Sequence, residues 1–336
     1  MADRVLAKAD AHVGLHDMMM DWVYSALGLV LLLLAGDSLV KGAVNLSLRL
    51  GVPALIVSLT VVAFGTSAPE LLISVQSILD NAPGLALGNV VGSNTANVLL
   101  VLGLPALLAT MHTSECDTRK SYVQMIFASL LFIGLAFRGE FDWLSGLILL
   151  TALAAMLSHA FLEVKRHKAA CAAGVQEVEI EDLEGADPDM PWPKVGVFLL
   201  LGLIGLPLGA SLLVEGAVNI ARTYDVSESV IGLTLVAVGT SLPELATTVM
   251  AALRKQADVA LGNVIGSNMF NLLAIMGIAS MVGPIPVDAQ FLTFDFWIML
   301  GASLLLVPFV FFRQDVGRVW GVALTTLYAL YIFVIL

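Results

Sequence analysis

Residues 64–75 read FGTSAPELLISV, and residues 238–249 read VGTSLPELATTV. Each stretch places a glycine, a threonine, a serine, a proline and a glutamate inside strongly apolar sequence. A carboxylate in the middle of a lipid bilayer costs about 3 kcal/mol or more, so such residues usually serve a function. Glu70 and Glu244 therefore mark two equivalent polar positions, and the sequence around them decides the fold.

The two stretches belong to a long internal repeat. Residues 52–104 match residues 226–278 without a gap, and about 24 of the 53 positions are identical. Upstream, LVKGAVNL at 39–46 matches LVEGAVNI at 213–220 at the same offset of 174 residues. A repeat of this length predicts two halves with the same local structure.

The composition is typical of a membrane protein. The chain has 336 residues, of which 59% are hydrophobic and 13% are charged, and its mean hydropathy is +0.94. Soluble domains contain about 25% charged residues. The apolar residues form runs close to the length of about 20 residues that crosses a bilayer as a helix, whereas a β-barrel needs short alternating segments. The pattern predicts an all-α integral membrane protein with ten transmembrane helices. The predicted spans lie at about 22–47, 52–79, 83–109, 120–137, 142–162, 194–220, 226–253, 258–280, 290–312 and 317–336.

One long polar segment divides the chain. We expect a first five-helix repeat at 22–162, an acidic cytoplasmic linker at 163–193 and a second five-helix repeat at 194–336. Residues 1–21 are either a polar N-terminal extension or sequence ahead of a later start codon. Because five is an odd number, the second half enters the membrane from the opposite face, which predicts repeats inverted about an axis in the membrane plane.

The basic residues predict the orientation, because lysine and arginine favour the cytoplasmic side. With the N-terminus outside, eleven of the 16 basic residues lie at inner ends of spans, four lie outside, and Lys41 lies within the first span. The eleven are Arg49, Arg119, Lys120, Lys165, Arg166, Lys168, Lys194, Arg254, Lys255, Arg313 and Arg318. We therefore expect both termini outside the plasma (inner) membrane and the linker in the cytoplasm.

Four polar islands interrupt the spans. They are AFGTSAPE (63–70) and GNVVGSNTAN (88–97) in the motif at 63–97, and AVGTSLPE (237–244) and GNVIGSNMFN (262–271) in the motif at 237–271. Proline removes a backbone donor and clashes one turn earlier, so Pro69 and Pro243 predict kinks. Such kinks are expected to free the carbonyls near 63–66 and 237–240, which a bilayer tolerates only against protein or a wet cavity.

The islands are rich in the oxygen donors that hard cations bind. The candidate side chains are Thr66, Ser67, Glu70, Ser93, Asn97, Thr240, Ser241, Glu244, Ser267 and Asn271. Thr66 and Glu70 are four residues apart and share a helix face, as do the corresponding pairs in the other islands. Ca²⁺ takes six to eight oxygen ligands, and the islands hold no histidine or cysteine that favours Zn²⁺ or Cu⁺. Faces from both halves are predicted to meet in a cation site at the membrane midplane.

The polar islands also allow other interpretations. A buried salt bridge needs a basic partner, and no lysine or arginine lies near either glutamate in the matching spans; a protonated buried acid is the remaining alternative. GNVVG and GNVIG also have the GxxxG spacing of closely packed membrane helices, which is compatible with a ligand role. Two carboxylates match one Ca²⁺ in charge or bind several Na⁺ instead, and a site that takes either load is the basis of exchange.

The paired motifs GTSAPE with GNVVGSNTAN and GTSLPE with GNVIGSNMFN resemble the two α-repeats of the calcium/cation antiporter superfamily, in its sodium/calcium exchanger branch of prokaryotic type. The resemblance covers nearly the whole chain. It implies Ca²⁺ and Na⁺ as transported substrates, exchanged by alternating access, with the first and sixth helices as a sliding gating pair. It implies the ten candidate side chains as metal ligands, together with the backbone carbonyls of Ala63 and Ala237.

The resemblance also frames the alternatives. Some members carry aspartate where this chain has Asn271, so we expect no potassium co-transport. The proton-coupled branch usually shows Gly-Asn before its motif acid, which disfavours a Ca²⁺/H⁺ exchanger, and kinked inverted repeats favour alternating access over a cation channel. We expect a transporter and not an enzyme, surrounded by membrane lipid, with no cofactor, no nucleic-acid partner and no required oligomer.

Two charged features are predicted to be structural. Asp37 and Lys41 are four residues apart on the first helix and should form a local ion pair. The acidic run at 177–189 lacks the spacing of an EF-hand loop and is expected to be a solvated segment of the linker.

Overall fold

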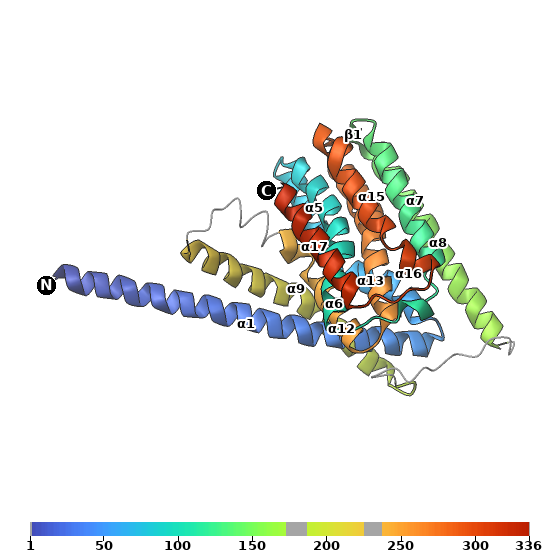
Figure 1. Cartoon of the computed structure of the whole chain (residues 1–336), viewed down its shortest axis with the longest axis horizontal. Coiled ribbons are helices and arrows are strands. Elements are labelled where there is room, and N and C mark those ends of the chain that lie inside the picture. Colours follow the sequence, from blue (N-terminus) through green and yellow to red (C-terminus); the bar gives the residue numbers. More distant parts are fainter. Residues whose placement is uncertain (1, 173–186, 225–236, 336) are drawn as a thin grey trace.

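The chain forms a bundle of helices crossed by one long helical pair (Figure 1). The computed structural model describes residues 2–172, 187–224 and 237–335. The first half contains α1 (Ala2–Leu50), α2 (Ala54–Val57), η1 (Ser58–Val62), α3 (Ala63–Thr66), α4 (Ala68–Leu79), α5 (Pro83–Ala96), η2 (Asn97–Val101), α6 (Gly103–Leu108), η3 (Thr113–Glu115), α7 (Arg119–Ala136), β1 (Glu140–Phe141) and α8 (Trp143–Ala172). The second half contains α9 (Trp192–Thr223), α11 (Ala237–Thr240), α12 (Leu242–Leu253), α13 (Ala257–Phe270), η5 (Asn271–Ile275), α14 (Met276–Val282), β2 (Ile285–Pro286), η6 (Phe291–Asp295), α15 (Phe296–Leu304), α16 (Val307–Phe311) and α17 (Arg318–Ile335).

The all-helical membrane architecture is confirmed, but the count of ten spans is not. Within the described ranges, seven helices are long and apolar enough to cross a membrane, and Ala54–Thr66 with Ala68–Leu79, bent by 42°, would make an eighth. α7 begins with Arg119 and Lys120, which lower its hydropathy. The start of the predicted span at 226–253 lies outside the described residues.

Some helix boundaries differ from the prediction. α1 begins at Ala2, so residues 2–21, expected as an N-terminal extension, continue the first helix. α8 extends past the predicted end at 162 to Ala172, because its last residues are mostly good helix formers such as lysine, arginine and alanine. Most of the acidic run at 177–189 lies outside the described residues.

Equivalent irregularities occur in both halves at the offset of 174 residues. The backbone at Ser67 has φ −84° and ψ 4°, and at Ser241 it has φ −87° and ψ 6°. α5 and α13 each continue into a π-helical turn, η2 and η5, a distortion that is frequent at functional sites. Asn81 and Lys255 both adopt a positive φ, of 59° and 57°, in the turns after α4 and α12. The sequence repeat is therefore accompanied by a repeat of local structure.

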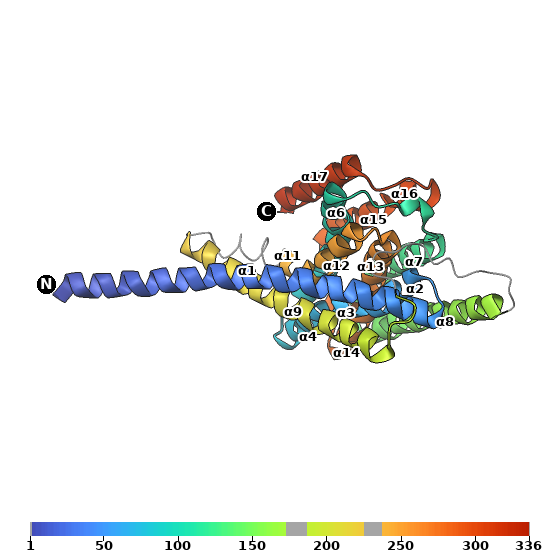
Figure 2. The ribbon, with the colours of Figure 1, turned by 90° about the horizontal axis from the view of Figure 1, so that it is seen from below.

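α1 and α9 lie side by side and cross the other helices, and the N-terminal part of α1 projects away from the bundle (Figures 1 and 2). Glycines allow this contact: a Cβ atom on Gly28 would lie 2.7 Å from the carbonyl oxygen of Gly209, and one on Gly209 would lie 3.0 Å from that of Gly28. Small residues let membrane helices approach closely. The two helices thus form one unit at the side of the bundle.

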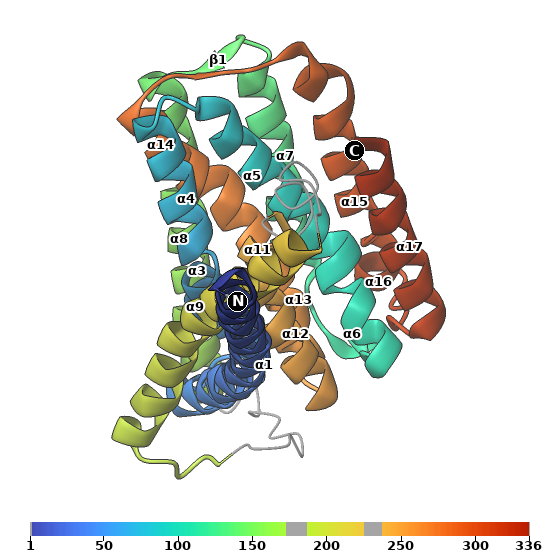
Figure 3. The same cartoon turned by 90° about the vertical axis from the view of Figure 1, so that its left-hand side faces the viewer.

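Short backbone pairings connect loops at opposite ends of the bundle. β1 pairs antiparallel with β2, with Phe141 opposite Ile285. At the other end, beyond α6 and α16, Met111 pairs with Val316 (Figure 3). Met111 lies 174 residues before Ile285, so equivalent loops of the two halves lie at opposite ends.

The segment that enters α9 is held against the end of α1. The Arg49 Nε donates to the Met190 carbonyl at 2.8 Å, and the Asp187 amide donates to the Asn45 side-chain oxygen at 2.8 Å. The loop after the first helix and the segment that enters α9 therefore lie at the same end of the bundle.

α13 is a central helix, and almost all of its residues are buried. A Cβ atom on Gly266 would lie 2.6 Å from the Ala63 Cβ, and one on Gly262 would lie 2.7 Å from the Ser58 Cβ. The close packing predicted from GxxxG is confirmed for α13. In α5, however, a Cβ on the equivalent Gly92 meets nothing within 4 Å, so that prediction is wrong for α5 in this conformation.

Candidate ion-binding site

Glu70 and Glu244 each lie in the first turn of a helix that follows a break. Glu70 begins α4 just after Ser67, and Glu244 begins α12 just after Ser241. A proline stands within the first two positions of each helix, where its missing N–H is tolerated. The free N–H groups and the dipole of a helix N-terminus favour negative charge, so both breaks suit a carboxylate.

Residues of the first half reach the acid of the second half. Ser67 Oγ donates a hydrogen bond to Glu244 Oε1 at 3.1 Å. Thr66 Oγ1 donates to the Asn263 side-chain oxygen at 3.3 Å. Thr66 Oγ1 lies 3.4 Å from Ser267 Oγ. The structure therefore brings together four of the predicted ligands from three polar islands.

Glu70 lies in the same region but has a different environment. Its side chain is fully buried, and neither carboxylate oxygen has a hydrogen-bond partner in the described part of the chain. Oε2 of Glu244 also has no partner there. Two buried carboxylates in one site repel each other unless a cation or a proton lies between them.

The remaining candidates are buried with varied partners. Asn97 Nδ2 donates to the Asn268 side-chain oxygen at 3.1 Å, whereas the Asn97 side-chain oxygen has no partner among the described residues. The same is true of both side-chain amide atoms of Asn271 and of Ser241 Oγ. All ten candidate side chains are at least nine-tenths buried, namely Thr66, Ser67, Glu70, Ser93, Asn97, Thr240, Ser241, Glu244, Ser267 and Asn271.

The carbonyl of Ala63 is not free, contrary to the prediction. It accepts the Ser67 backbone amide at 3.1 Å and the Thr66 hydroxyl at 3.3 Å. The bend of 42° is gentle enough to keep the helical hydrogen bond to Ser67. Ala237 begins α11 at the edge of a described range, and the role of its carbonyl stays a prediction.

Asn89 and Asn263 were not selected from the sequence as functional residues, yet they position the acids. Asn89 Nδ2 donates to the Glu70 carbonyl at 3.3 Å and to Ser74 Oγ at 3.1 Å. Asn263 Nδ2 repeats this pattern, donating to the Glu244 carbonyl at 3.2 Å and to Thr248 Oγ1 at 3.1 Å. Their identity at the repeat offset was the available signal.

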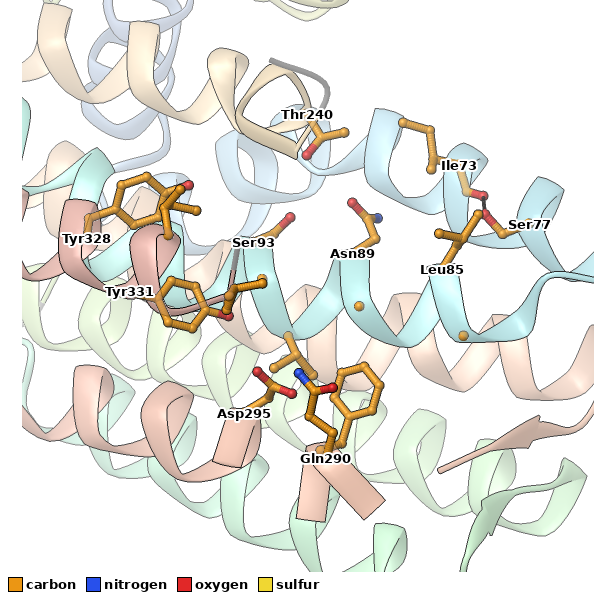
Figure 4. Close-up of a pocket in the computed structure, with 17 residues that line it drawn as sticks. Ile73, Ser77, Leu85, Asn89, Ser93, Thr240, Gln290, Asp295, Tyr328 and Tyr331 are labelled. Carbon is orange, nitrogen blue, oxygen red and sulfur yellow. Dashed lines mark hydrogen bonds between the residues drawn. The ribbon is translucent and has the colours of Figure 1, made fainter. Parts of the chain in front are cut away.

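A cavity of about 410 Å³ lies beside the site (Figure 4). Its lining includes the exposed residues Leu85 and Gln290 as well as the buried Ser93 and Thr240, both predicted ligands. The cavity therefore extends from the surface of the bundle to two of the predicted ligands.

A second, much smaller pocket shares two equivalent positions with this cavity and serves below as its counterpart. A pocket of about 40 Å³ is lined by residues that include Ser121 and Leu157. These lie 174 residues before Asp295 and Tyr331, which line the large cavity. In this conformation one approach is wide and its counterpart is nearly closed.

The site offers oxygen ligands only. In the described ranges, no three residues among histidine, cysteine, aspartate and glutamate come together as a metal cluster, so an ion here must also use hydroxyl and amide oxygens. No lysine or arginine in these ranges pairs with Glu70 or Glu244. Oxygen donors with two carboxylates suit hard cations such as Ca²⁺ and Na⁺.

A helical membrane bundle with a buried oxygen-rich site between two related halves is typical of secondary cation transporters. The sodium/calcium exchanger protein family matches residues 20–162 and 194–336, and the chain belongs to this family. The unmatched segment between these ranges coincides with the linker predicted from the sequence.

Individual relatives extend this result. The chain is 33% identical over 342 residues to the sodium/calcium exchanger MaX1 of Methanosarcina acetivorans, covering 92% of this chain and 96% of that protein. It is 33% identical over 299 residues to the inner membrane protein YrbG of Escherichia coli, covering 89% and 91%. It is similar to a solved structure of the sodium-calcium exchanger NCX_Mj, with a TM-score of 0.79, 31% identity and coverage of 95% and 100%.

Proposed function

We propose that this protein exchanges Na⁺ for Ca²⁺ across the membrane by alternating access. The observation that carries the proposal is the contact of Ser67, from the first half, with Glu244, from the second, beside the bare carboxylate of Glu70. A site shared between the halves changes its access when the halves move relative to each other. The proposal includes ten spans in two inverted five-helix repeats, with both termini outside and the linker in the cytoplasm.

The proposed ligands are the ten candidate side chains. One Ca²⁺ neutralises Glu70 and Glu244, and several Na⁺ take the same oxygens in its absence. A loaded site can be occluded, whereas an empty one leaves two unpaired carboxylates in a dry interior, which is costly. Exchange is coupled because only the loaded forms cross easily.

The two cavities suggest how access alternates. Ions reach the site through the cavity of about 410 Å³, while the counterpart of about 40 Å³ is nearly closed. We assign the motion to α1 and α9, which pack on each other and lie across the helices that carry the site. Sliding of this pair closes the wide cavity and opens the narrow one.

The relatives support the choice of ions. MaX1 is named a sodium/calcium exchanger. The NCX_Mj structures were obtained after soaks with Na⁺, Ca²⁺ and Sr²⁺, and they address extracellular ion exchange and occlusion of the binding site. Ca²⁺ and Sr²⁺ fit an oxygen site with two carboxylates.

Flux measurements on the purified protein in proteoliposomes test the proposal. Uptake of labelled Ca²⁺ should be driven by an outward Na⁺ gradient and not by a K⁺ or H⁺ gradient. Uptake driven by protons instead would replace the proposal with a Ca²⁺/H⁺ exchanger. Uptake that needs no counter-ion and does not saturate would indicate a channel.

A further inference from the structure

Asp295 is a buried carboxylate outside the proposed ion site. It ends the π-helical turn η6, and it is 5% exposed. Figure 4 shows its carboxylate in the large cavity, next to Gln290 and facing the helix that carries Ser93. In the described part of the chain, no hydrogen bond or ion pair satisfies this carboxylate, and no residue lining the cavity is basic.

The surroundings of Asp295 are suited to a cation. An uncompensated carboxylate in a low-dielectric cavity focuses the electric field and concentrates counter-ions. Ser93, Gln290 and Tyr331 place further oxygen atoms in the same lining. The Tyr331 and Asp295 side chains line the same cavity, with Tyr331 on α17 and Asp295 at the end of η6.

The two halves differ at this position. The residue 174 places before Asp295 is Ser121, and the residue 174 places before Tyr331 is Leu157. Both line the small counterpart pocket, which contains no carboxylate. The charge is therefore a property of one approach to the site and not of the repeat.

We propose that Asp295 is an accessory cation-binding residue that holds Na⁺ or Ca²⁺ in the large cavity and passes it to the site through Ser93. The inference rests on the proposed function, because it takes the two exchanged ions as its ligands. The proposal predicts an asymmetry between the two sides of the membrane. The protein should bind ions more readily from the side of the large cavity than from the side of the small pocket, which has no equivalent carboxylate.

Sided flux measurements on Asp295→Asn test the inference. Ca²⁺ exchange is measured in right-side-out and in inside-out membrane vesicles, at low ionic strength. The variant should raise the half-saturating Ca²⁺ concentration about tenfold on one side only, because one unit charge close to the ion is removed. The maximal rate should stay within about twofold of the wild type, and Asp295→Glu should restore most of the affinity.

Asp288→Asn is the matched control. Asp288 is exposed, lies seven residues earlier and does not line the cavity, so its variant removes the same charge from the same region. Equal half-saturation in Asp295→Asn and wild type, or an equal shift in Asp288→Asn, overturns the inference. A loss of maximal rate with unchanged half-saturation also overturns it, since that result indicates a structural role.

Failure of the proposed function is recognised separately. If the wild type shows no Na⁺-driven Ca²⁺ exchange, the proposed function is wrong. Equilibrium binding of labelled Ca²⁺ to the purified protein then decides the inference. Asp295→Asn should weaken this binding and Asp288→Asn should not; equal binding by both variants rejects the accessory site.

Discussion

α5 and α13 carry nearly the same motif in opposite surroundings. In α13, Gly266 packs against Ala63 so closely that a Cβ atom would lie 2.6 Å from the Ala63 Cβ. In α5, Gly92 lines the cavity of about 410 Å³ and meets nothing within 4 Å. The same residues thus support a closed and an open environment in one molecule. If the halves exchange these environments, both faces of the site open in turn without any change in chemistry.

The two acids show the same contrast. Glu244 accepts a hydrogen bond from the Ser67 hydroxyl at 3.1 Å, whereas neither carboxylate oxygen of Glu70 has a partner among the described residues. Glu70 belongs to the first half, whose helix α5 lines the open cavity. The asymmetry belongs to the conformation, because the two sequence motifs are nearly identical.

Replacing either acid should have the largest effect. Glu70→Gln and Glu244→Gln should each lower Ca²⁺ exchange at least about 100-fold. Either change leaves one positive charge of the bound Ca²⁺ without a carboxylate, and an uncompensated buried charge costs about 3–5 kcal/mol. Flux in proteoliposomes at equal expression measures the loss. Glu140→Gln, at an exposed glutamate, is the control. Normal exchange by either site variant would show that the site is misplaced.

Alanine at Gly266 or at Gly92 tests the difference between the packing of α13 and that of α5. Gly266→Ala should disfavour the present conformation, and Gly92→Ala should disfavour the opposite one, because overpacking costs about 1–3 kcal/mol. Both variants should slow exchange about tenfold. One should bind labelled Ca²⁺ mainly from one side of the membrane, and the other mainly from the opposite side. Gly134→Ala, in α7 with nothing within 4 Å, is the control. Shifts in the same direction would contradict the exchange of environments.

Asn97 and Asn271 occupy equivalent positions in the two halves but have different hydrogen-bond partners. Asn97 donates to Asn268, but the amide of Asn271 has no partner in the described ranges. Asn271→Asp adds a third charge at the unpartnered position, so it should shift the half-saturating Ca²⁺ concentration about fivefold and make it more sensitive to pH between 6 and 8. Titrations at both pH values measure this, with Asn97→Asp for comparison. Unchanged curves would show that Asn271 is peripheral.

An ion pair connects α1 with the end of α12, the helix that carries Glu244. The predicted pair of Asp37 and Lys41 is confirmed at 2.9 Å, and Asp37 also pairs with Arg254 at the end of α12. The proposed sliding of α1 relative to α12 would break the contact between Asp37 and Arg254. Arg254→Gln should therefore change the exchange rate about two- to threefold, as befits a partly exposed pair. Lys255→Gln removes the same charge from the neighbouring exposed residue, and an equal effect there would exclude a specific role.

The smallest effect is expected at the start of α8. Backbone and side-chain hydrogen bonds from Ser145, together with Arg138, lower the pKa of Asp142 to about 2. Because the pKa is lowered, ionised Asp142 stabilises the fold at pH values above its unfolded pKa of about 3.9. This stabilisation is lost only as the pH falls toward 2. Asp142→Ala should therefore lower the thermal midpoint slightly and equally at pH 5 and pH 8. A loss that differs between these pH values would contradict this assignment.

Much of the site could be predicted because its signal is local. Glycine, proline and glutamate within apolar sequence predict a break and a costly charge, and the repeat offset doubles each of these signals. The structure places Glu70 and Glu244 after breaks of the same geometry, as Pro69 and Pro243 predicted. The two-half organisation follows from the same repeat.

The rest depends on contacts between distant segments. The pair of Asp37 with Arg254 joins residues 217 positions apart, and no local pattern indicates it. The Ala63 carbonyl keeps its helical partner because the bend is gentle, which a proline alone does not reveal. The burial of Asp295 requires the helices to be packed. The openness of one cavity is a property of the conformation, and both conformations share one sequence.

The most direct test is a crystal structure of the protein soaked with Sr²⁺, whose anomalous signal locates the ion. We expect a strong peak between the carboxylates of Glu70 and Glu244, within bonding distance of hydroxyls from both halves, and its disappearance on a further soak in excess Na⁺. A peak bound by one acid only, or none between the two acids at saturating Sr²⁺, would contradict a shared site.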